Sequence, residues 1–396
     1  MKKRIILHVD VNNAFLSWTA VDMLNKGHKV DIRNRFSVIG GDEKQRRGIV
    51  LAKSNPAKKM GVVTAESLYM ARKKCPNLEV YPPDYNLYAK FSDMLYNYLT
   101  TYSPLVERYS VDECFVDYTG CENLFGDAFE VAYKIKNEIK EKFGFTVNVG
   151  VGNNKLCAKM ASDFSKPDKV HTLFLDEVKT KMWPLDVADL FMIGKKTALK
   201  LKEFGIIKIF DLAHADYEFL TRHFKNMAKK MIEFANGIDE SEVEGESNDL
   251  KSISCSTVLP FDYDNMEDIK KVIRKLTFDV GRRLRQFNYF AYVVGVSIKY
   301  SNFSKVSKQK QLDRNVNSDS ELYSLGVQLF TDLWNKEAVR NIAFFVTNFT
   351  EKANLQLSLF DNNEIILSDN KLQKTIDELR GKYGNEKIIY GDMIKK

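Results

Sequence analysis

The sequence lacks the cysteine patterns of disulfide-rich and zinc-binding proteins. Its 396 residues include five cysteines, an odd number, with no Cys-x-x-Cys spacing, so neither a disulfide framework nor a zinc site is indicated. It also lacks an apolar run of about 18 residues, the length a membrane-spanning helix needs. The first four residues resemble the start of a signal peptide, but His8 and Asp10 interrupt the apolar run that follows. We therefore expect a soluble, cytoplasmic protein that does not bind membranes.

Low-complexity tracts are also absent, which argues against a large disordered part. Hydrophobic residues make up 44% of the chain, and a chain of this length predicts two to four domains. Lys and Arg outnumber Asp and Glu by 60 to 53. This mild basic excess is compatible with a polyanionic partner but does not by itself indicate one.

Three acidic residues interrupt apolar segments. Residues 5–9 form an apolar run that ends at Asp10, which predicts a buried strand with a carboxylate at its tip. Short apolar pieces flank Asp112 and Glu113, which predicts a hairpin whose turn contains both acids. Acidic residues in turns usually face water. Burying several carboxylates together, however, requires a compensating cation.

The oxygen ligands of this acidic set favour magnesium, with manganese as a substitute. Two such ions about 3.5 to 4 Å apart can activate an attacking hydroxyl and stabilise the leaving oxygen of a phosphoryl transfer. This chemistry suits a nucleotide polymerase.

The remaining patterns predict an α+β protein with several domains. Residues 106–165 read as strand, strand, helix, strand, helix, and with the strand at 5–9 they indicate a split βαβ sheet. Residues 185–240 show only helical patterns, and 239–249 read as a polar linker.

A second βαββαβ pattern begins at Lys251. We expect its elements at 251–258, 267–287, 291–300, 305–312, 320–335 and 339–348. Within it, residues 280–312 contain seven Lys or Arg residues and no acid. Such a stretch is typical of a surface that follows phosphates.

Three ordered motifs together resemble the Y-family DNA polymerases over about the first 360 residues. They are Asp10-Val11-Asn12-Asn13-Ala14-Phe15, Ser110-Val111-Asp112-Glu113, and Gly150-Val151-Gly152-Asn153-Asn154-Lys155-Leu156 with Ala158-Lys159 and Ser165-Lys166-Pro167. The resemblance implies that Asp10 and Asp112 bridge two metal ions, that Glu113 completes the site, and that the Val11 carbonyl is a further ligand.

The same resemblance implies residues that bind the nucleotide. Phe15 is expected to be the steric gate against ribonucleotides, because a ring packed at C2′ leaves no room for a hydroxyl. Lys53, Lys58 and Lys166 are expected at the triphosphate. The segment Asn55-Pro56-Ala57-Lys58 departs from the Tyr-x-x-Arg of many members and resembles the UmuC-type branch. Ala14, where an aromatic is usual, is a second departure.

The DNA contacts implied by the resemblance lie in two regions. Met192-Ile193-Gly194 resembles a helix-hairpin-helix that lacks its first glycine, and Met resists the left-handed angles that glycine tolerates. The residues expected to contact DNA are Gly194, Lys195, Lys196, Arg282, Arg283, Arg285, Lys299, Lys305, Lys308 and Lys310.

A short apolar motif lies near the C-terminus. Gln356-Leu357-Ser358-Leu359-Phe360 resembles the peptide by which bacterial polymerases bind the sliding clamp, with Gln356, Leu357, Leu359 and Phe360 as its contacts. Clamp binding would raise the local concentration of a distributive enzyme at the primer end. Beyond it, residues 372–383 have the spacing of an amphipathic helix with no assigned role.

The resemblance implies a right-hand polymerase. The expected domains are a palm (1–13 and 84–173), fingers (14–83), a helical thumb (174–240), a linker (241–250), a little finger (251–350) and a tail (351–396). The expected activity is low-fidelity translesion synthesis on primer-template DNA with dNTPs, without proofreading, by a monomeric catalytic subunit of the DNA-damage (SOS) response. Alternatives are another palm-type enzyme such as a nucleotide cyclase, and a non-catalytic DNA-binding accessory protein.

Overall fold

A computed structural model describes residues 4–245, 250–351, 373, 375–384 and 388. The chain forms two compact units, one of residues 1–41 and 48–247 and one of residues 42–47 and 248–396. Each unit has a hydrophobic core of its own. None of the helices in the described ranges is both long enough and apolar enough to cross a membrane.

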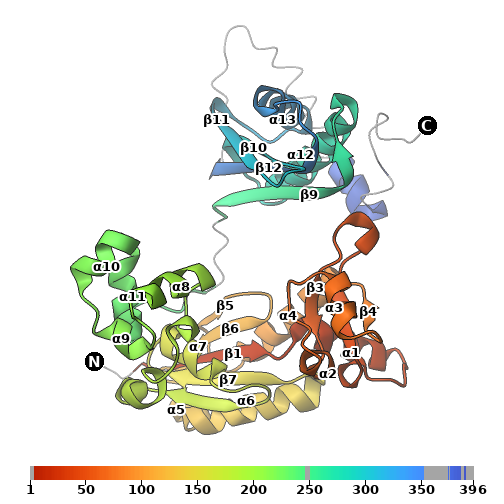
Figure 1. The fold of residues 1–396 in the computed structure, drawn as a ribbon. Coiled ribbons are helices and arrows are strands. Elements are labelled where there is room, and N and C mark those ends of the chain that lie inside the picture. The colour runs from red at the N-terminus through yellow and green to blue at the C-terminus, as the bar shows by residue number, and fades with distance from the viewer. Residues whose placement is uncertain (1–3, 246–249, 352–372, 374, 385–387, 389–396) are drawn as a thin grey trace. The chain divides into compact units, whose positions relative to one another are not determined.

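The central sheet of the first unit has the strand order β5-β6-β1-β7-β8 (Figure 1). β1 lies in the middle and pairs antiparallel with β6 and β7, and β7 pairs parallel with β8. The strands are β1 (Ile6–Val11), β5 (Val106–Arg108), β6 (Glu113–Asp117), β7 (Val147–Gly152) and β8 (Val170–Leu173).

The two faces of this sheet have different neighbours, because side chains alternate along a strand. Leu7, Val9 and Val11 face the main core, and His8 and Asp10 point to the other face. Three helices contribute to the core on the first side and one helix packs on the second. They are α1 (Ala14–Asn25), α4 (Tyr85–Leu99) and α6 (Ala128–Phe143), and then α7 (Lys155–Asp163).

The rest of the first unit consists of a small sheet and a helical region, each with its own core. The small sheet has the order β3-β2-β4, from β2 (Ser37–Gly40), β3 (Val50–Lys53) and β4 (Glu79–Tyr81), with α2 (Asn55–Lys59) and α3 (Leu68–Lys74). The helical region contains α8 (Lys195–Glu203), α9 (Ile209–Ala213), α10 (Tyr217–Phe224) and α11 (Met227–Ala235). Short helices lie at Ile32–Asn34, Glu122–Phe125 (α5), Leu175–Glu177, Val178–Met182 and Val187–Asp189.

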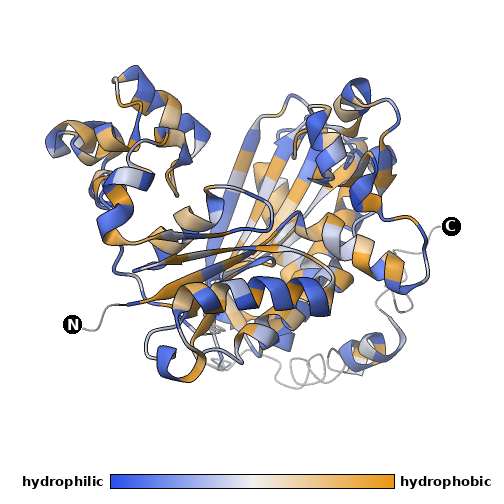
Figure 2. Cartoon of the chain, turned by 90° about the horizontal axis from the view of Figure 1, so that it is seen from below, coloured by the Kyte–Doolittle hydropathy of each residue, from blue (hydrophilic) through white to orange (hydrophobic). Residues whose placement is uncertain are grey.

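The second unit is a four-stranded antiparallel sheet of order β11-β10-β12-β9 with two helices on one face. Its elements follow the expected βαββαβ order: β9 (Ser252–Tyr263), α12 (Met266–Gln286), β10 (Phe290–Tyr300), β11 (Lys305–Val316), α13 (Asp319–Leu333) and β12 (Val339–Thr350). Figure 2 shows hydrophobic and hydrophilic residues alternating around the helices, as packing on one side requires. The short helix Glu43–Gln45 also belongs to this unit.

The start of the expected linker is held against the first unit. Val243 is buried with Ile6 and Phe115. The Lys155 ammonium donates a hydrogen bond to the Glu242 carbonyl, 3.2 Å away, and the Glu244 N–H donates one to the Glu107 carboxylate, 2.9 Å away. The first part of the 241–250 segment therefore packs with the first unit.

Two sequence expectations differ from the observed structure. Asp10 lies inside β1, which continues to Val11, and not at the strand tip. From the sequence, a helix that begins after Asp127 is expected to bury Phe129, Ala132, Tyr133 and Ile139. Ala132 and Ile139 are buried, but Phe129 and Tyr133 are about 40% exposed on α6, because the buried stripe lies on another side of the helix.

Candidate active site

Register brings the predicted acids together at the same end of β1 and β6. Asp10 is the direct partner of Glu113 across the antiparallel pair, and the Val11 N–H donates a hydrogen bond to the Asp112 carbonyl at 3.1 Å. Directly opposed residues on neighbouring strands share a face of the sheet. Asp10 and Glu113 therefore lie side by side on the face covered by α7.

The turn before β6 fixes Asp112. The Ser110 hydroxyl donates a hydrogen bond to the Asp112 carboxylate at 2.7 Å. The N–H groups of Tyr109 and Ser110 both donate to the Glu113 carbonyl. This closed turn explains the Ser-Val-Asp-Glu spacing, because the serine orients the first acid while the second begins the strand.

Two glycines of the third motif allow α7 to approach the acids. A Cβ atom on Gly150 would lie 1.9 Å from the Ala158 carbonyl oxygen, and one on Gly152 would lie 2.7 Å from the Ala158 nitrogen. Both glycines are on β7, next to β1. Only glycine permits this contact between a strand and the backbone of a helix.

Two lysines reach the acids from this side. The Lys159 ammonium, on α7, lies 2.5 Å from Glu113 Oε1 and 3.7 Å from Asp10 Oδ2. The Lys166 ammonium lies 2.6 Å from Asp10 Oδ2 and 2.8 Å from Asp163 Oδ1. Lys166 was expected from the sequence. Lys159 belongs to the third motif but was not expected from the sequence to have a role of its own.

A buried amide network holds the loop that bears Lys166. The Asn12 amide donates to the Asn148 oxygen at 3.1 Å, and Asn148 donates to the carbonyls of Ser162 and Ser165 at 2.9 and 2.6 Å. The Asp168 N–H donates to Asn12 Oδ1 at 2.9 Å. Asn12 and Asn148 thus connect β1 and β7 to both sides of Lys166.

The carboxylates have unusual proton affinities in this environment. Burial raises the pKa of Asp10 to about 6 in spite of Lys166, and burial also raises the pKa of Asp112. Burial opposes ionisation of Glu113 too, but contacts with His8 and Lys159 lower its pKa to about 2. His8 is fully buried, and burial lowers its pKa to about 4. His8 is therefore neutral at pH 7, and Lys159 is the contact that keeps Glu113 ionised.

The donor set fits a divalent cation better than it fits the two lysines alone. In the described ranges, no three acidic, histidine or cysteine side chains are gathered closely enough to enclose a metal ion as they stand. The raised pKa values of Asp10 and Asp112 nevertheless indicate a shortage of positive charge. Magnesium and manganese prefer carboxylate oxygens of this kind.

Phe15 is the first aromatic of α1 and packs in a cluster of rings. It stacks on Tyr88 with 4.4 Å between ring centroids and 5° between the planes, and Tyr85 meets its edge. The Thr19 hydroxyl donates to the Phe15 carbonyl and lies 3.2 Å from the Tyr88 hydroxyl. The ring expected to be the gate is therefore supported from behind, while Ala14 is buried.

The other two lysines expected at the triphosphate come from the small sheet. Lys53 ends β3 and donates a hydrogen bond to the Thr64 hydroxyl at 2.9 Å. Partial burial and the charge of Lys58 lower the pKa of Lys53. Lys58 is exposed on α2, so the two ammonium groups form a local positive site.

The hairpin expected to bind DNA precedes α8. Met192 adopts the left-handed backbone conformation, with a φ of 74°, although it is not glycine. Gly194 caps α8, and Lys195 and Lys196 are exposed in its first turn. The backbone therefore has the left-handed residue of the hairpin in spite of the missing glycine.

The basic residues of 280–312 do not form one surface in the second unit. Lys299 and Lys305 are partners across β10 and β11 and lie on the face of the sheet without helices. Lys308 and Lys310 pair with Val296 and Val294, whose side chains face the helices, and Lys308 contacts Asp332 of α13 at 3.0 Å. The basic residues of these two strands therefore divide between the two faces of the sheet.

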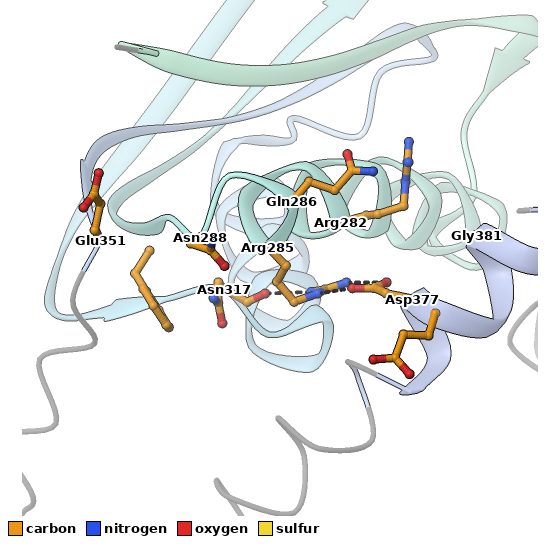
Figure 3. Close-up of a pocket in the computed structure, with 10 residues that line it drawn as sticks. Arg282, Arg285, Gln286, Asn288, Asn317, Glu351, Asp377 and Gly381 are labelled. Carbon is orange, nitrogen blue, oxygen red and sulfur yellow. Dashed lines mark hydrogen bonds and ion pairs between the residues drawn. The ribbon is translucent and has the colours of Figure 1, made fainter. Parts of the chain in front are cut away.

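The three arginines expected to contact DNA, Arg282, Arg283 and Arg285, belong to α12 and so also lie on the helix side of this sheet. Arg285 is only 14% exposed and pairs with Asp319 at 2.8 Å. It also pairs with Asp377 at 2.6 Å, and Figure 3 shows these two side chains facing each other. Arg282 and Arg285 both line a cavity of about 680 Å³. Arg283 donates a hydrogen bond to the Ser254 carbonyl of β9. Arg285 thus binds protein carboxylates in this structure. The clamp-like peptide at 356–360 lies outside the described residues.

The chain is similar over its whole length to known proteins. Residues 9–163 match the impB/mucB/samB family, and residues 250–359 match the C-terminal domain of that family. The chain is 44% identical to a protein named DNA polymerase IV from Clostridium acetobutylicum, over 99% of both chains. It is 32% identical to DNA polymerase IV 1 of Bacillus subtilis, over 100% of this chain and 94% of that one.

Solved structures show the same fold. An insertion ternary complex of Dbh DNA polymerase is 25% identical, covers 88% of this chain and 100% of its own, and has a TM-score of 0.61. A Y-family chimera of Dbh and Dpo4 has a TM-score of 0.76 at 24% identity. Fold and site together define a palm-type nucleotidyl transferase. The chain belongs to the Y family of DNA polymerases.

Proposed function

We propose that the chain extends a DNA primer by attack of the primer 3′-hydroxyl on the α-phosphate of a dNTP, with release of pyrophosphate. As a Y-family member it is a DNA-directed DNA polymerase of the translesion kind. The main support for this chemistry is the register that puts Asp10 beside Glu113, with Asp112 held in the adjoining turn. We further propose that the five-stranded sheet is the palm and that the βαββαβ unit is the little finger.

Asp10, Asp112 and Glu113, with the Val11 carbonyl, would hold two magnesium ions, for which manganese can substitute. The ions would supply an activated hydroxyl and stabilise the leaving oxygen. Burial raises the pKa values of Asp10 and Asp112, and a cation would favour their ionised forms when it binds. Ser110 keeps the Asp112 carboxylate oriented in the meantime.

The nucleotide would bind between the sheet and the rings around Phe15. Stacking on Tyr88 fixes the Phe15 ring, so that it can exclude a 2′-hydroxyl. Lys166, 36% exposed, can leave Asp10 to follow the triphosphate. Lys58, the residue that resembles the UmuC-type branch, would act with Lys53 as a point charge and not as a bidentate donor.

Extension of a primed template opposite an undamaged base and opposite an abasic site tests this proposal. The wild-type protein should extend both templates in Mg²⁺. Asp112→Asn should bind the DNA but lose extension by about 10³-fold or more, as expected when an essential ligand is removed from a unit that acts as a whole. Asp176→Asn, an exposed acid outside the site, is the control and should match the wild type. Extension by Asp112→Asn at the wild-type rate would rule out this metal site.

We propose two further contacts. The N-terminal turn of α8, with Gly194, Lys195 and Lys196, would contact a DNA phosphate through its free N–H groups. The peptide 356–360 would bind a bacterial sliding clamp. Phe360→Ala in the full chain should abolish stimulation of synthesis by the clamp and leave extension without the clamp unchanged. Equal stimulation of both proteins would exclude this peptide.

A further inference from the structure

Lys159 is a buried cation at the centre of the acidic site. Its ammonium contacts Glu113 at 2.5 Å, and Asp10 and Asp163 each lie 3.7 Å away. The side chain is only 10% exposed, compared with 36% for Lys166. A lysine this deeply buried is placed to act on the carboxylates themselves.

The backbone of α7 is fixed at this position. The Ser162 hydroxyl donates to the Lys159 carbonyl at 2.8 Å and lies 2.8 Å from His8 Nδ1. The contacts of Gly150 and Gly152 hold the same helix against β7. Lys159 therefore cannot withdraw by moving the helix, and a change of partner must occur within the side chain.

The oxygens bound by Lys159 are those that a metal ion requires. Glu113 Oε1 accepts the short contact, and Asp10 Oδ2 lies within ion-pair distance of both lysines. An ammonium and a divalent cation cannot share one carboxylate oxygen at contact distance without strong repulsion. Binding of metal at Glu113 thus requires Lys159 to move aside.

Asp163 is the second partner within reach, because its Oδ2 lies 3.7 Å from the Lys159 ammonium while its Oδ1 pairs with Lys166 at 2.8 Å. It lies one turn further along α7, four residues from Lys159, and its carboxylate is 46% exposed and faces the same ammonium. Residues four apart on a helix can pair without backbone movement. A small rotation of the lysine side chain would shorten this contact and open Glu113.

We propose that Lys159 is the internal counter-cation of the metal-free site, and that it exchanges Glu113 for Asp163 when divalent cations bind. This inference rests on the proposed metal site at Asp10, Asp112 and Glu113. In this arrangement Lys159 is a positioning residue. It keeps the carboxylates charged and separated before metal arrives, at the cost of competing with the metal.

Two substitutions should therefore change metal affinity in opposite directions. Lys159→Met removes the competitor and should tighten Mn²⁺ binding several-fold. Asp163→Asn removes the second partner, so Lys159 stays on Glu113 and Mn²⁺ binding should weaken several-fold. Lys155→Met is the matched control. It removes a lysine of similar exposure from the same helix, paired with Glu107 and not with a proposed ligand, and should leave the affinity unchanged.

Electron paramagnetic resonance titration of the full chain with Mn²⁺ alone, without DNA or nucleotide, measures these affinities independently of catalysis. In EDTA, Lys159→Met should also melt at a lower temperature than the wild type and gain more from added Mn²⁺. Lys159→Arg, which retains the charge, should bind like the wild type and covers the case in which Lys159→Met does not fold.

The outcomes separate this inference from the proposed function. If Asp112→Asn binds Mn²⁺ as tightly as the wild type, the metal site itself is misplaced. If Asp112→Asn loses the ion but Lys159→Met binds no more tightly than the wild type, the site stands and the exchange is wrong. Tighter binding by Asp163→Asn would also overturn it.

Discussion

The absence of a side chain at Gly150 determines where α7 and its Lys159 ammonium lie. A methyl group there would overlap the Ala158 carbonyl, a backbone atom that can move only with the whole helix. Displacing α7 would carry Lys159 away from Glu113 and would disturb the hydrogen bond between His8 and Ser162. Gly150 on β7 therefore determines whether Lys159 can reach Glu113, although Glu113 lies two strands away on β6.

Gly150→Ala should consequently destabilise the first unit and reduce primer extension. Overpacking of this kind costs about 1 to 3 kcal/mol, measurable as a lower midpoint in urea. Gly245→Ala is the control, because nothing lies within 4 Å of a Cβ atom there and its φ is not positive. Equal stability of the two variants would show that α7 can shift freely.

The raised pKa of Asp10 predicts how the stability of the metal-free protein depends on pH. Its folded value of about 6 lies above the 3.8 of an unfolded carboxyl. Its contribution is therefore fully present below pH 3.8 and is lost as the pH rises through 6. Glu113 titrates near 2, below this window.

Between pH 5 and 7 in EDTA, the wild type should lose stability relative to Asp10→Asn, by on the order of 2 kcal/mol. Urea unfolding of both proteins across this range measures the difference. Saturating Mg²⁺ should remove the trend, because the cation keeps Asp10 ionised. A constant difference across the range would mean that Asp10 has an ordinary proton affinity.

At the scale of single residues, the sequence indicated three acids that the structure brings together, but not what surrounds them. Asp10, Asp112 and Glu113 were found because acids interrupt apolar runs. Lys159 was not assigned a role, because a lysine on an amphipathic helix has the pattern of a solvent-facing residue. Only the glycine contacts and the register, which are tertiary features, show that it is buried.

Among the elements, the hairpin before α8 stores backbone strain. Met192 has a φ of 74° and is about half exposed, so little packing compensates for the left-handed angle. Met192→Gly should raise stability by about 1 kcal/mol. Met70→Gly, at an exposed position inside α3, should lower it by about as much. Thermal unfolding of both variants should therefore show shifts of opposite sign.

The helix at residues 375–383 contacts α12 of the second unit through side chains. Arg285 bridges Asp319 and Asp377, and the Arg380 guanidinium stacks 3.9 Å from the Phe278 ring centroid. Arg285→Met would leave Asp319, 4% exposed, without this buried counter-charge. Removing one partner of such a pair costs about 3 kcal/mol.

Hydrogen exchange of the α12 and α13 amides should report this loss as weaker protection. Arg314→Met removes an arginine paired with Glu321 at the surface, and a change within about 0.5 kcal/mol is expected there. If both variants exchange alike, Arg285 is not structural, and its expected role in binding DNA would regain support.

Element prediction succeeded where segments were long. All six elements of the second unit fall within a few residues of their expected bounds, because their periodic patterns extend over eight or more residues. β2, β3 and β4 have only three or four residues each and were not foreseen, since so short a run shows no periodicity. β8 was missed for the same reason.

At the scale of the molecule, the two faces of the sheet in the second unit differ in their lysines and in helix packing. This difference predicts which face binds DNA. Lys299 and Lys305 lie on the helix-free face, whereas Lys308 is beside α13. We expect DNA to follow the helix-free face. Lys299→Ala and Lys305→Ala should each weaken binding to primer-template DNA and lower its salt dependence by about one released counterion. Lys308→Ala should change neither quantity, and fluorescence anisotropy at several salt concentrations distinguishes the three.

The βαββαβ order of the second unit was accessible from the sequence, since its segments have clear periodicity. The distribution of charge in space was not. The seven basic residues of 280–312 lie on two faces of the sheet in the second unit. Neighbouring residues on a strand point in opposite directions, and α12 packs on one side only. Linear charge clusters therefore indicate a nucleic-acid partner more reliably than they indicate the contact surface.

Because Val243 and Glu244 are held against the first unit, few residues of the chain remain between them and the second unit. The seven residues 245–251 separate the last anchored residue from the start of β9. Even fully extended, they span at most about 28 Å. This length sets an upper limit on the distance between Glu244, which is hydrogen-bonded to Glu107 of the first unit, and the first residue of β9.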